Sequence, residues 1–99
     1  MSKQEVINTI RQILKQHPYV LRAELFGSLA RGDDRPGSDV DLLVVYDDAT
    51  RPKGFRAYTI YGELEEALGR NVDIVQDKLL HGFVRENIKD DRELIYERH

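Results

Sequence analysis

An apolar stripe at helical spacing opens the chain and predicts a first helix. Its members are Val6, Ile10, Ile13 and Leu14. A period near 3.6 residues is typical of a helix that buries one face. Ser2 and Glu5 fit a capping box, in which each side chain satisfies a free backbone N–H at the helix start. Because Pro18 cannot continue a helix, we expect this one to end near Gln16.

Three short segments rich in apolar and β-branched residues predict strands. We expect them at Tyr19–Phe26, Asp39–Tyr46 and Asn71–Gln76. In the first segment apolar residues occupy every second position from Leu21 to Leu25, which is the period of a strand with one buried face. The segment between the first two strands, Gly27–Gly37, contains three Gly, one Pro and two Asp, so we expect a loop with one helical turn.

Two further helices complete the expected order, helix–strand–loop–strand–helix–strand–helix. The earlier one, Phe55–Leu68, ends before Gly69, a residue type common just past a helix end. Its expected apolar face consists of Ala57, Tyr61, Leu64 and Leu68. The later one is expected from about Leu79 to Tyr96, with Gly82 as a candidate break.

Length and composition narrow the class of protein. With 99 residues, 40% hydrophobic and 33% charged, we expect one globular domain spanning residues 1–99. The absence of Cys excludes disulfides and thiolate metal sites. The net charge of −3 disfavours nucleic acid as a partner, because phosphate backbones attract basic surfaces. The longest apolar run, Leu42–Val45, is far shorter than the ~20 residues that cross a membrane, and the N-terminus lacks a signal-type stretch, so we expect a cytoplasmic protein.

Paired acids at the start of an otherwise apolar strand are the strongest chemical signal. Asp39 and Asp41 are two residues apart, so on a strand they point to the same face. Two carboxylates ~4 Å apart repel by about 4 kcal/mol at an effective dielectric near 20. Such a pair raises one pKa or recruits a cation, and Mg²⁺ suits it because it binds one or two carboxylates and completes its shell with water and phosphate oxygens. The alternative for Asp39 is a turn residue that follows Ser38.

Asp73 offers a third carboxylate within another short apolar strand. If this strand neighbours the one that carries Asp39 and Asp41, three acids converge. Three carboxylates can hold two metal ions, the arrangement used for in-line phosphoryl or nucleotidyl transfer. The alternatives for Asp73 are a position on a solvent-facing edge strand and an ion pair with Arg70.

A Gly-Ser element directly after the first strand is the candidate phosphate site. Gly27 has no Cβ and lets a phosphate approach the backbone, while Ser28 adds a hydroxyl donor. Arg31, three residues later, could contact a phosphate from the same side of a helical turn. The structural alternatives are a plain strand-to-helix junction with Ser28 as N-cap, and an ion pair of Arg31 with Asp33 or Asp34.

The combined motif resembles that of the nucleotidyltransferase superfamily that includes DNA polymerase β. It reads Gly27-Ser28-x-x-Arg31-Gly32, then Ser38-Asp39-x-Asp41-Leu42, then Asp73. The small size is similar to that of the minimal nucleotidyltransferases (MNT), the antitoxin partners of prokaryotic HEPN toxins. This resemblance implies an α+β fold of the polymerase β-like type, with a small mixed β-sheet and helices packed on one side.

The same resemblance implies an activity, which is the transfer of AMP from ATP to a tyrosine hydroxyl of a HEPN toxin with release of pyrophosphate. By residue matching, Asp39 and Asp41 would ligate two Mg²⁺ ions. Asp73 would ligate the ion nearer the acceptor and help to deprotonate it, while Gly27 and Ser28 would hold the triphosphate. Two alternatives remain open at this point. The chain could be an antitoxin that neutralises its toxin by binding alone, or a nucleotidyltransferase acting on a small molecule or nucleic acid.

Overall fold

Helices and strands alternate along the described part of the chain, which in this computed structural model comprises residues 1–35, 37–79 and 91–98. In chain order the elements are α1 (Lys3–Lys15), β1 (Val20–Phe26), α2 (Gly27–Arg31), β2 (Val40–Tyr46), the 3₁₀ helix η1 (Gly54–Tyr58), α3 (Thr59–Leu68), β3 (Val72–Gln76), the 3₁₀ helix η2 (Asp77–Leu79) and β4 (Glu93–Glu97). None of the helices among these elements has both the length and the apolar character that a bilayer crossing demands.

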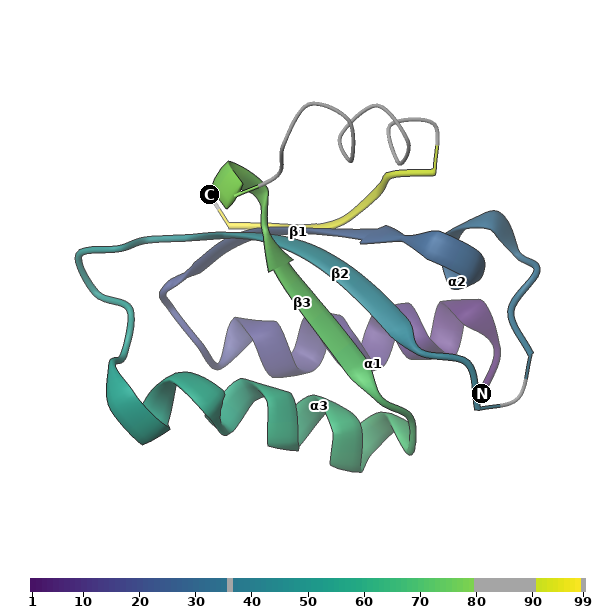
Figure 1. The fold of residues 1–99 in the computed structure, drawn as a ribbon, viewed down its shortest axis with the longest axis horizontal. Helices are drawn as coiled ribbons and strands as arrows, with labels where there is room; N and C mark the ends of the chain where they lie inside the picture. Colours follow the sequence, from purple (N-terminus) through teal and green to yellow (C-terminus); the bar gives the residue numbers. More distant parts are fainter. Residues whose placement is uncertain (36, 80–90, 99) are drawn as a thin grey trace.

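The four strands form one mixed sheet in the order β3-β2-β1-β4. β1 runs antiparallel to β2 and to β4, whereas β2 and β3 are parallel and connected through α3. Figure 1 shows α1 and α3 on the same face of this sheet. The expected α+β class, with a small mixed sheet and helices packed on one side, is therefore confirmed.

The hydrophobic core fills the space between the sheet and the two helices α1 and α3. Its side chains that are at most 1% exposed include Val6, Ile10, Leu14, Ala23, Leu25, Leu42, Val44, Ile60 and Leu64. Burying each Val, Leu or Ile among them contributes roughly 1.5–3 kcal/mol. Ile60 is a core residue that the expected apolar face omitted, and Ala57 belongs to η1 rather than to α3.

Both ends of α1 follow the sequence pattern. The Ser2 hydroxyl accepts a hydrogen bond from the Glu5 N–H, and the Glu5 carboxylate accepts one from the Ser2 N–H, both at 3.1 Å. The helix stops at its C-cap, Gln16, as expected. Arg98, which follows β4, donates a hydrogen bond to the carbonyl oxygen of Leu14 at 3.3 Å, so the chain's last described residue braces the end of its first helix.

The expected final helix, Leu79–Tyr96, is wrong at its C-terminal end, where Glu93–Glu97 forms β4. This strand pairs antiparallel with β1 and buries the neighbouring side chains Ile95 and Tyr96. The apolar residues of this segment also fit a helical spacing, but pairing with β1, about 70 residues earlier in the chain, makes the segment a strand. The middle of the expected helix, residues 80–90, lies outside the described residues.

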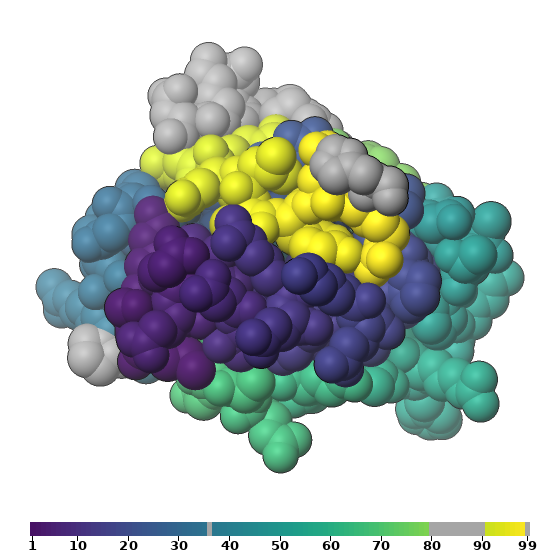
Figure 2. Space-filling view, turned by 180° about the vertical axis from the view of Figure 1, so that it is seen from behind, coloured from purple at the N-terminus to yellow at the C-terminus, as the bar shows by residue number. Residues whose placement is uncertain are grey.

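Side chains from the helices α1 and α3 form hydrogen bonds with backbone groups of both outer strands of the sheet. On β4, Arg11 of α1 donates to the carbonyl oxygen of Ile95 at 2.6 Å, and Figure 2 shows α1, in purple, lying along the yellow C-terminal strand. On β3, the Tyr61 hydroxyl of α3 donates to the carbonyl oxygen of Ile74 at 3.2 Å. Glu65 of α3 accepts the N–H of the first residue of β3 at 3.1 Å. Exposed strand edges with free backbone groups are thereby reduced.

A buried ion pair lies on the sheet face opposite to α1 and α3. Glu24 points to this face because its neighbours Ala23 and Leu25 lie in the core, and it is only 6% exposed. Arg92 binds its carboxylate in a bidentate manner at 2.7 and 2.9 Å and also reaches Asp77 at 3.1 Å. The hydrogen bonds from Arg92 hold the pKa of Glu24 below its ordinary value despite burial.

We expect Arg92→Ala to lower the free energy of unfolding at pH 7 by roughly 2 kcal/mol, because it removes both hydrogen bonds of the buried Glu24 carboxylate and leaves it only Arg22, at 3.2 Å. Since the folded state lowers the pKa of Glu24, the pair stabilises fully above the unfolded pKa of about 4.3 and loses that contribution as the pH falls. Urea denaturation at pH 7 and at acid pH measures both effects. Lys78→Ala, which removes the exposed partner of Asp48, is the control and should change little. Equal losses in the two variants would contradict the prediction.

Candidate active site

Asp41 and Asp73 lie side by side at one end of the sheet. Each is the second residue of its strand, and the parallel register of β2 and β3 makes them direct partners. Adjacent strands are about 4.8 Å apart. Because Val40, Leu42 and Val72 point into the core, the two carboxylates project from the opposite face, which α1 and α3 leave uncovered. The ion pair expected as an alternative for Asp73 does not form, since Arg70 binds Asp34 instead.

Asp39 is exposed and stands immediately before β2, two residues from Asp41. Its charge is one of the causes that raise the pKa of Asp41, so the two carboxylates are within electrostatic range of each other. The structure therefore places all three predicted acids at the same end of the sheet, with Asp41 and Asp73 on the paired strands β2 and β3 and Asp39 just before β2.

The electrostatics of Asp41 are those of a half-buried acid among other acids. Burial raises the pKa of Asp41 most, the Asp73 carboxylate raises it next, and Asp39 adds to the rise. The Arg31 cation lowers the pKa in part, while a side-chain hydrogen bond with Asp73 raises it further. Because the pKa is raised, the ionised Asp41 carboxylate destabilises the folded state unless a cation binds next to it.

Gly27 lies against Asp41, and both its backbone conformation and this contact disfavour a side chain at the position. It follows Phe26, the β1 residue that pairs with Asp41, and has a φ of +78°. A Cβ at this position would run into Oδ2 of Asp41 and stand 3.2 Å from its Cγ. The absence of a side chain thus lets the Asp41 carboxylate lie directly against the backbone at the start of α2.

Ser28 and Arg31 lie on α2, the single helical turn expected after the first strand. Ser28 is not the N-cap, because that position belongs to Phe26, which makes no side-chain capping bond. Arg31 is paired with Asp33 at 3.2 Å, as one alternative anticipated, and also with Asp91 at 3.1 Å. Its side chain remains 46% exposed, so a further anion can approach it.

The residues at this end of the sheet fit a hard divalent cation. Within the described ranges 1–35, 37–79 and 91–98, no three Asp, Glu or His side chains are grouped closely enough to hold a metal ion by themselves. Mg²⁺ does not require such a group, since it takes one or two carboxylates and completes its octahedron with water and substrate phosphate oxygens. Asp41 and Asp73 supply two such oxygen donors on adjacent strands.

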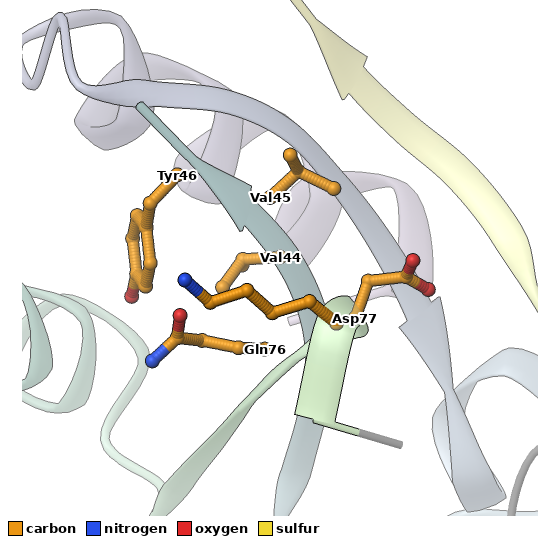
Figure 3. A pocket seen from close by; sticks show the side chains of 6 residues that line it. Val44, Val45, Tyr46, Gln76 and Asp77 are labelled. Carbon is orange, nitrogen blue, oxygen red and sulfur yellow. The ribbon is translucent and has the colours of Figure 1, made fainter. Parts of the chain in front are cut away.

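A small cavity opens at the other end of the same two strands. Val44, Val45, Tyr46, Gln76, Asp77 and Lys78 line it, and Figure 3 labels the first five of these. Its volume is about 80 Å³, whereas cavities that enclose small ligands measure roughly 300–1,000 Å³. Lys78 is also engaged by Asp48 at 2.6 Å. This cavity is therefore separate from the acids and too small to hold a nucleotide.

Two contacts around the site were not anticipated from the sequence. Asp91 pairs with Arg31 across 60 residues, and Arg70 links the loop before Asp39 to the strand of Asp73. The sequence contained one weak signal for the second contact, because Arg70 lies three residues before an acid in an apolar strand. The expected partner of Arg70 was Asp73, whereas the structure shows Asp34.

Comparison with known proteins now defines the class of this chain. The model of the polymerase beta nucleotidyltransferase family matches residues 8–99, so the chain belongs to that family. A relative from Methanocaldococcus jannaschii, named "Putative protein adenylyltransferase MJ1379", is 32% identical over 100 residues that cover 93% of this chain and 98% of the relative. A second protein of that organism, MJ0435, bears the same type of name and is 33% identical over 88 residues that cover 89% of this chain and 91% of the relative.

Solved structures share the fold. A structure described as that of a "putative minimal nucleotidyltransferase" is 29% identical and has a TM-score of 0.72, with 97% of this chain and 96% of that chain covered. A chain of a toxin–antitoxin complex with AMP-PNP has a TM-score of 0.73 at 21% identity, covering 94% of this chain and 74% of the other. A chain of the Shewanella oneidensis complex between tri-AMPylated HEPN toxin and MNT antitoxin has a TM-score of 0.69 at 20% identity, covering 97% and 73%. The expected likeness to MNT antitoxins is thereby confirmed at the level of the fold.

We expect Gly27→Ala to be more destabilising than Gly32→Ala. Both glycines have a left-handed φ, +78° and +83°, where a Cβ costs roughly 1–2 kcal/mol. Only at Gly27 does the added Cβ also meet Asp41, whereas nothing lies within 4 Å at Gly32. Urea denaturation of the two variants measures the difference. Losses of the same size would show that the space beside Asp41 is not constrained.

Asp41→Asn should raise the melting temperature at pH 7 when no divalent cation is present. Folding raises the pKa of Asp41, so at neutral pH the ionised carboxylate destabilises the folded state, and a neutral amide removes that penalty. A gain of 1 kcal/mol corresponds to about 4–8 °C in a domain of this size. Asp48→Asn is the matched control, because Lys78 lowers the pKa of Asp48 and no gain is expected there. A clear fall in melting temperature for Asp41→Asn alone would refute this.

Proposed function

We propose that this protein is an antitoxin nucleotidyltransferase that transfers AMP from ATP to a tyrosine hydroxyl of a cognate HEPN toxin. One observation carries the proposal, namely the direct pairing of Asp41 with Asp73 on parallel strands, with Asp39 two residues before Asp41. Membership of the nucleotidyltransferase family supports the reaction type. The names of the relatives support a protein as acceptor, and the likeness to chains of toxin–antitoxin complexes supports a HEPN partner.

The acids are the proposed ligands of two Mg²⁺ ions. Asp39 and Asp41 would hold both ions, and Asp73 would hold the one nearer the acceptor. When bound, Mg²⁺ neutralises triphosphate charge and polarises the attacking hydroxyl. The oxygen-only donor set and the like charges that raise the pKa of Asp41 suit such a cation.

The Gly-Ser turn is the proposed site of the triphosphate. Gly27 allows phosphate oxygens to approach the backbone next to Asp41, and Ser28 offers a hydroxyl one residue further on. Arg31 would contact a phosphate oxygen from the exposed side of α2. Together these residues orient the α-phosphorus in line with the incoming oxygen, which is the main task of the protein in such a transfer.

In the proposed reaction one bond forms and one breaks. The tyrosine oxygen bonds to the α-phosphorus of ATP, and the bond from that phosphorus to the oxygen bridging to the β-phosphate breaks. Pyrophosphate leaves with the electron pair, and Asp73 assists removal of the hydroxyl proton. The toxin then carries AMP as a phosphodiester on its tyrosine.

The test is mass spectrometry of the HEPN toxin encoded beside this protein's gene, after incubation with this protein, ATP and Mg²⁺. We expect AMP on a toxin tyrosine with the parent protein and with Asp48→Asn, and none above background with Asp39→Asn or Asp41→Asn, both of which should remain folded. A toxin that is inhibited but unmodified would instead support neutralisation by binding alone. Label from α-phosphate-labelled ATP in RNA or in small hydroxyl compounds, with none in the toxin, would support a different acceptor.

A further inference from the structure

Arg70 joins the two segments that lead into the acids. It lies between α3 and β3, three residues before Asp73, and its side chain is only 12% exposed. Its Nε donates a hydrogen bond to the carbonyl oxygen of Ser38 at 2.7 Å, and Ser38 directly precedes Asp39. Its Nη2 binds Asp34 at 3.1 Å. The guanidinium therefore holds the loop before β2 against the start of β3.

Backbone hydrogen bonds also join the segment before β2 to the start of β3. The Val40 N–H, between Asp39 and Asp41, donates to the carbonyl oxygen of Asn71 at 2.9 Å. The Val72 N–H is held by Glu65 of α3 at 3.1 Å. Residues 70–72 are thus tied to residues 38–40 on one side and to α3 on the other, immediately before Asp73.

Ser38, which Arg70 contacts, is also hydrogen-bonded to Arg35. The Arg35 N–H donates to the Ser38 hydroxyl at 2.8 Å, and the Ser38 N–H donates to the Arg35 carbonyl oxygen at 2.9 Å. These bonds use the hydroxyl and the N–H of Ser38, and its carbonyl oxygen goes to Arg70. Asp39 is exposed and stands just before its strand, so the bond from Arg70 to the Ser38 carbonyl oxygen holds the backbone next to it.

We propose that Arg70 is a positioning residue that sets the separation of Asp39 from Asp73 and thereby the affinity of the acidic site for a divalent cation. This inference rests on the proposed function, because it takes the three acids as cation ligands. Arginine suits the task since its planar fork donates in two fixed directions, to Ser38 and to Asp34 here, whereas lysine offers a single point charge. Groups that orient metal ligands from behind typically change metal affinity roughly 10–100-fold when removed.

The experiment measures Mn²⁺ binding by electron paramagnetic resonance, with and without a non-hydrolysable ATP analogue, because Mn²⁺ reports on a Mg²⁺ site without any turnover. We expect Arg70→Ala to bind Mn²⁺ at least about tenfold more weakly than the parent protein. Arg70→Lys, which keeps the charge but not the fork, should lose most of that affinity as well. Asp34→Asn keeps an acceptor for Arg70 and should bind Mn²⁺ within about twofold of the parent, since the bond to Ser38 remains.

Arg98→Ala is the matched control for a loss of structure. Arg98 also donates from its guanidinium to backbone carbonyl oxygens, those of Leu14, Lys15 and Val20, but far from the acids. Both alanine variants should lower the melting temperature, and only Arg70→Ala should weaken Mn²⁺ binding. If Arg70→Ala does not fold, Arg70→Lys carries the comparison.

The outcomes separate this inference from the proposed function. Unchanged Mn²⁺ affinity in the Arg70 variants, or an equal loss in Arg98→Ala, overturns the positioning role while leaving the proposed function in place. A parent protein that binds no Mn²⁺ in either state overturns the proposed function itself. Weaker binding confined to the Arg70 variants supports the positioning role, even where the toxin receives no AMP.

Discussion

The parallel pairing of β2 with β3 is the constraint on which the arrangement of this protein depends. It places Asp41 and Asp73 in register on adjacent strands, where burial and mutual repulsion raise the pKa of Asp41. The register is held from the other face by core residues that alternate with the acids, such as Leu42 and Val72. A slip by one residue would turn the acids into the core and the core residues outward, so packing and site geometry are specified together.

Local signals explain why much of the fold and the candidate site could be predicted. The helix boundaries at Ser2 and Gln16 depend on capping and on a nearby proline, which act within a few residues. The acids could be named because a carboxylate near the start of a short apolar strand conflicts with both strand propensity and burial. That conflict is visible at Asp41 and Asp73 without knowledge of which strands are neighbours.

Contacts between distant parts of the chain explain the errors. The strand β4 has apolar residues that also fit a helix, and only its pairing with β1 and the burial of Ile95 decide between the two. No local feature of the sequence identifies the partners of Arg70 and Asp91. Arg70 meets Ser38, and Asp91 meets Arg31, only because the sheet order brings distant segments of the chain together. Charged residues on connecting segments can satisfy several partners, and the choice among them is made by tertiary structure.

The capped edges of the sheet limit how another protein can recognise this one. Arg11 occupies a carbonyl oxygen on β4, and Tyr61 and Glu65 occupy backbone groups on β3. A partner that docks by strand addition would need those same backbone groups and would first have to displace the three side chains. Recognition through side chains on a face of the domain meets no such competition, and the same caps disfavour the edge-to-edge association through which small β-sheet proteins aggregate.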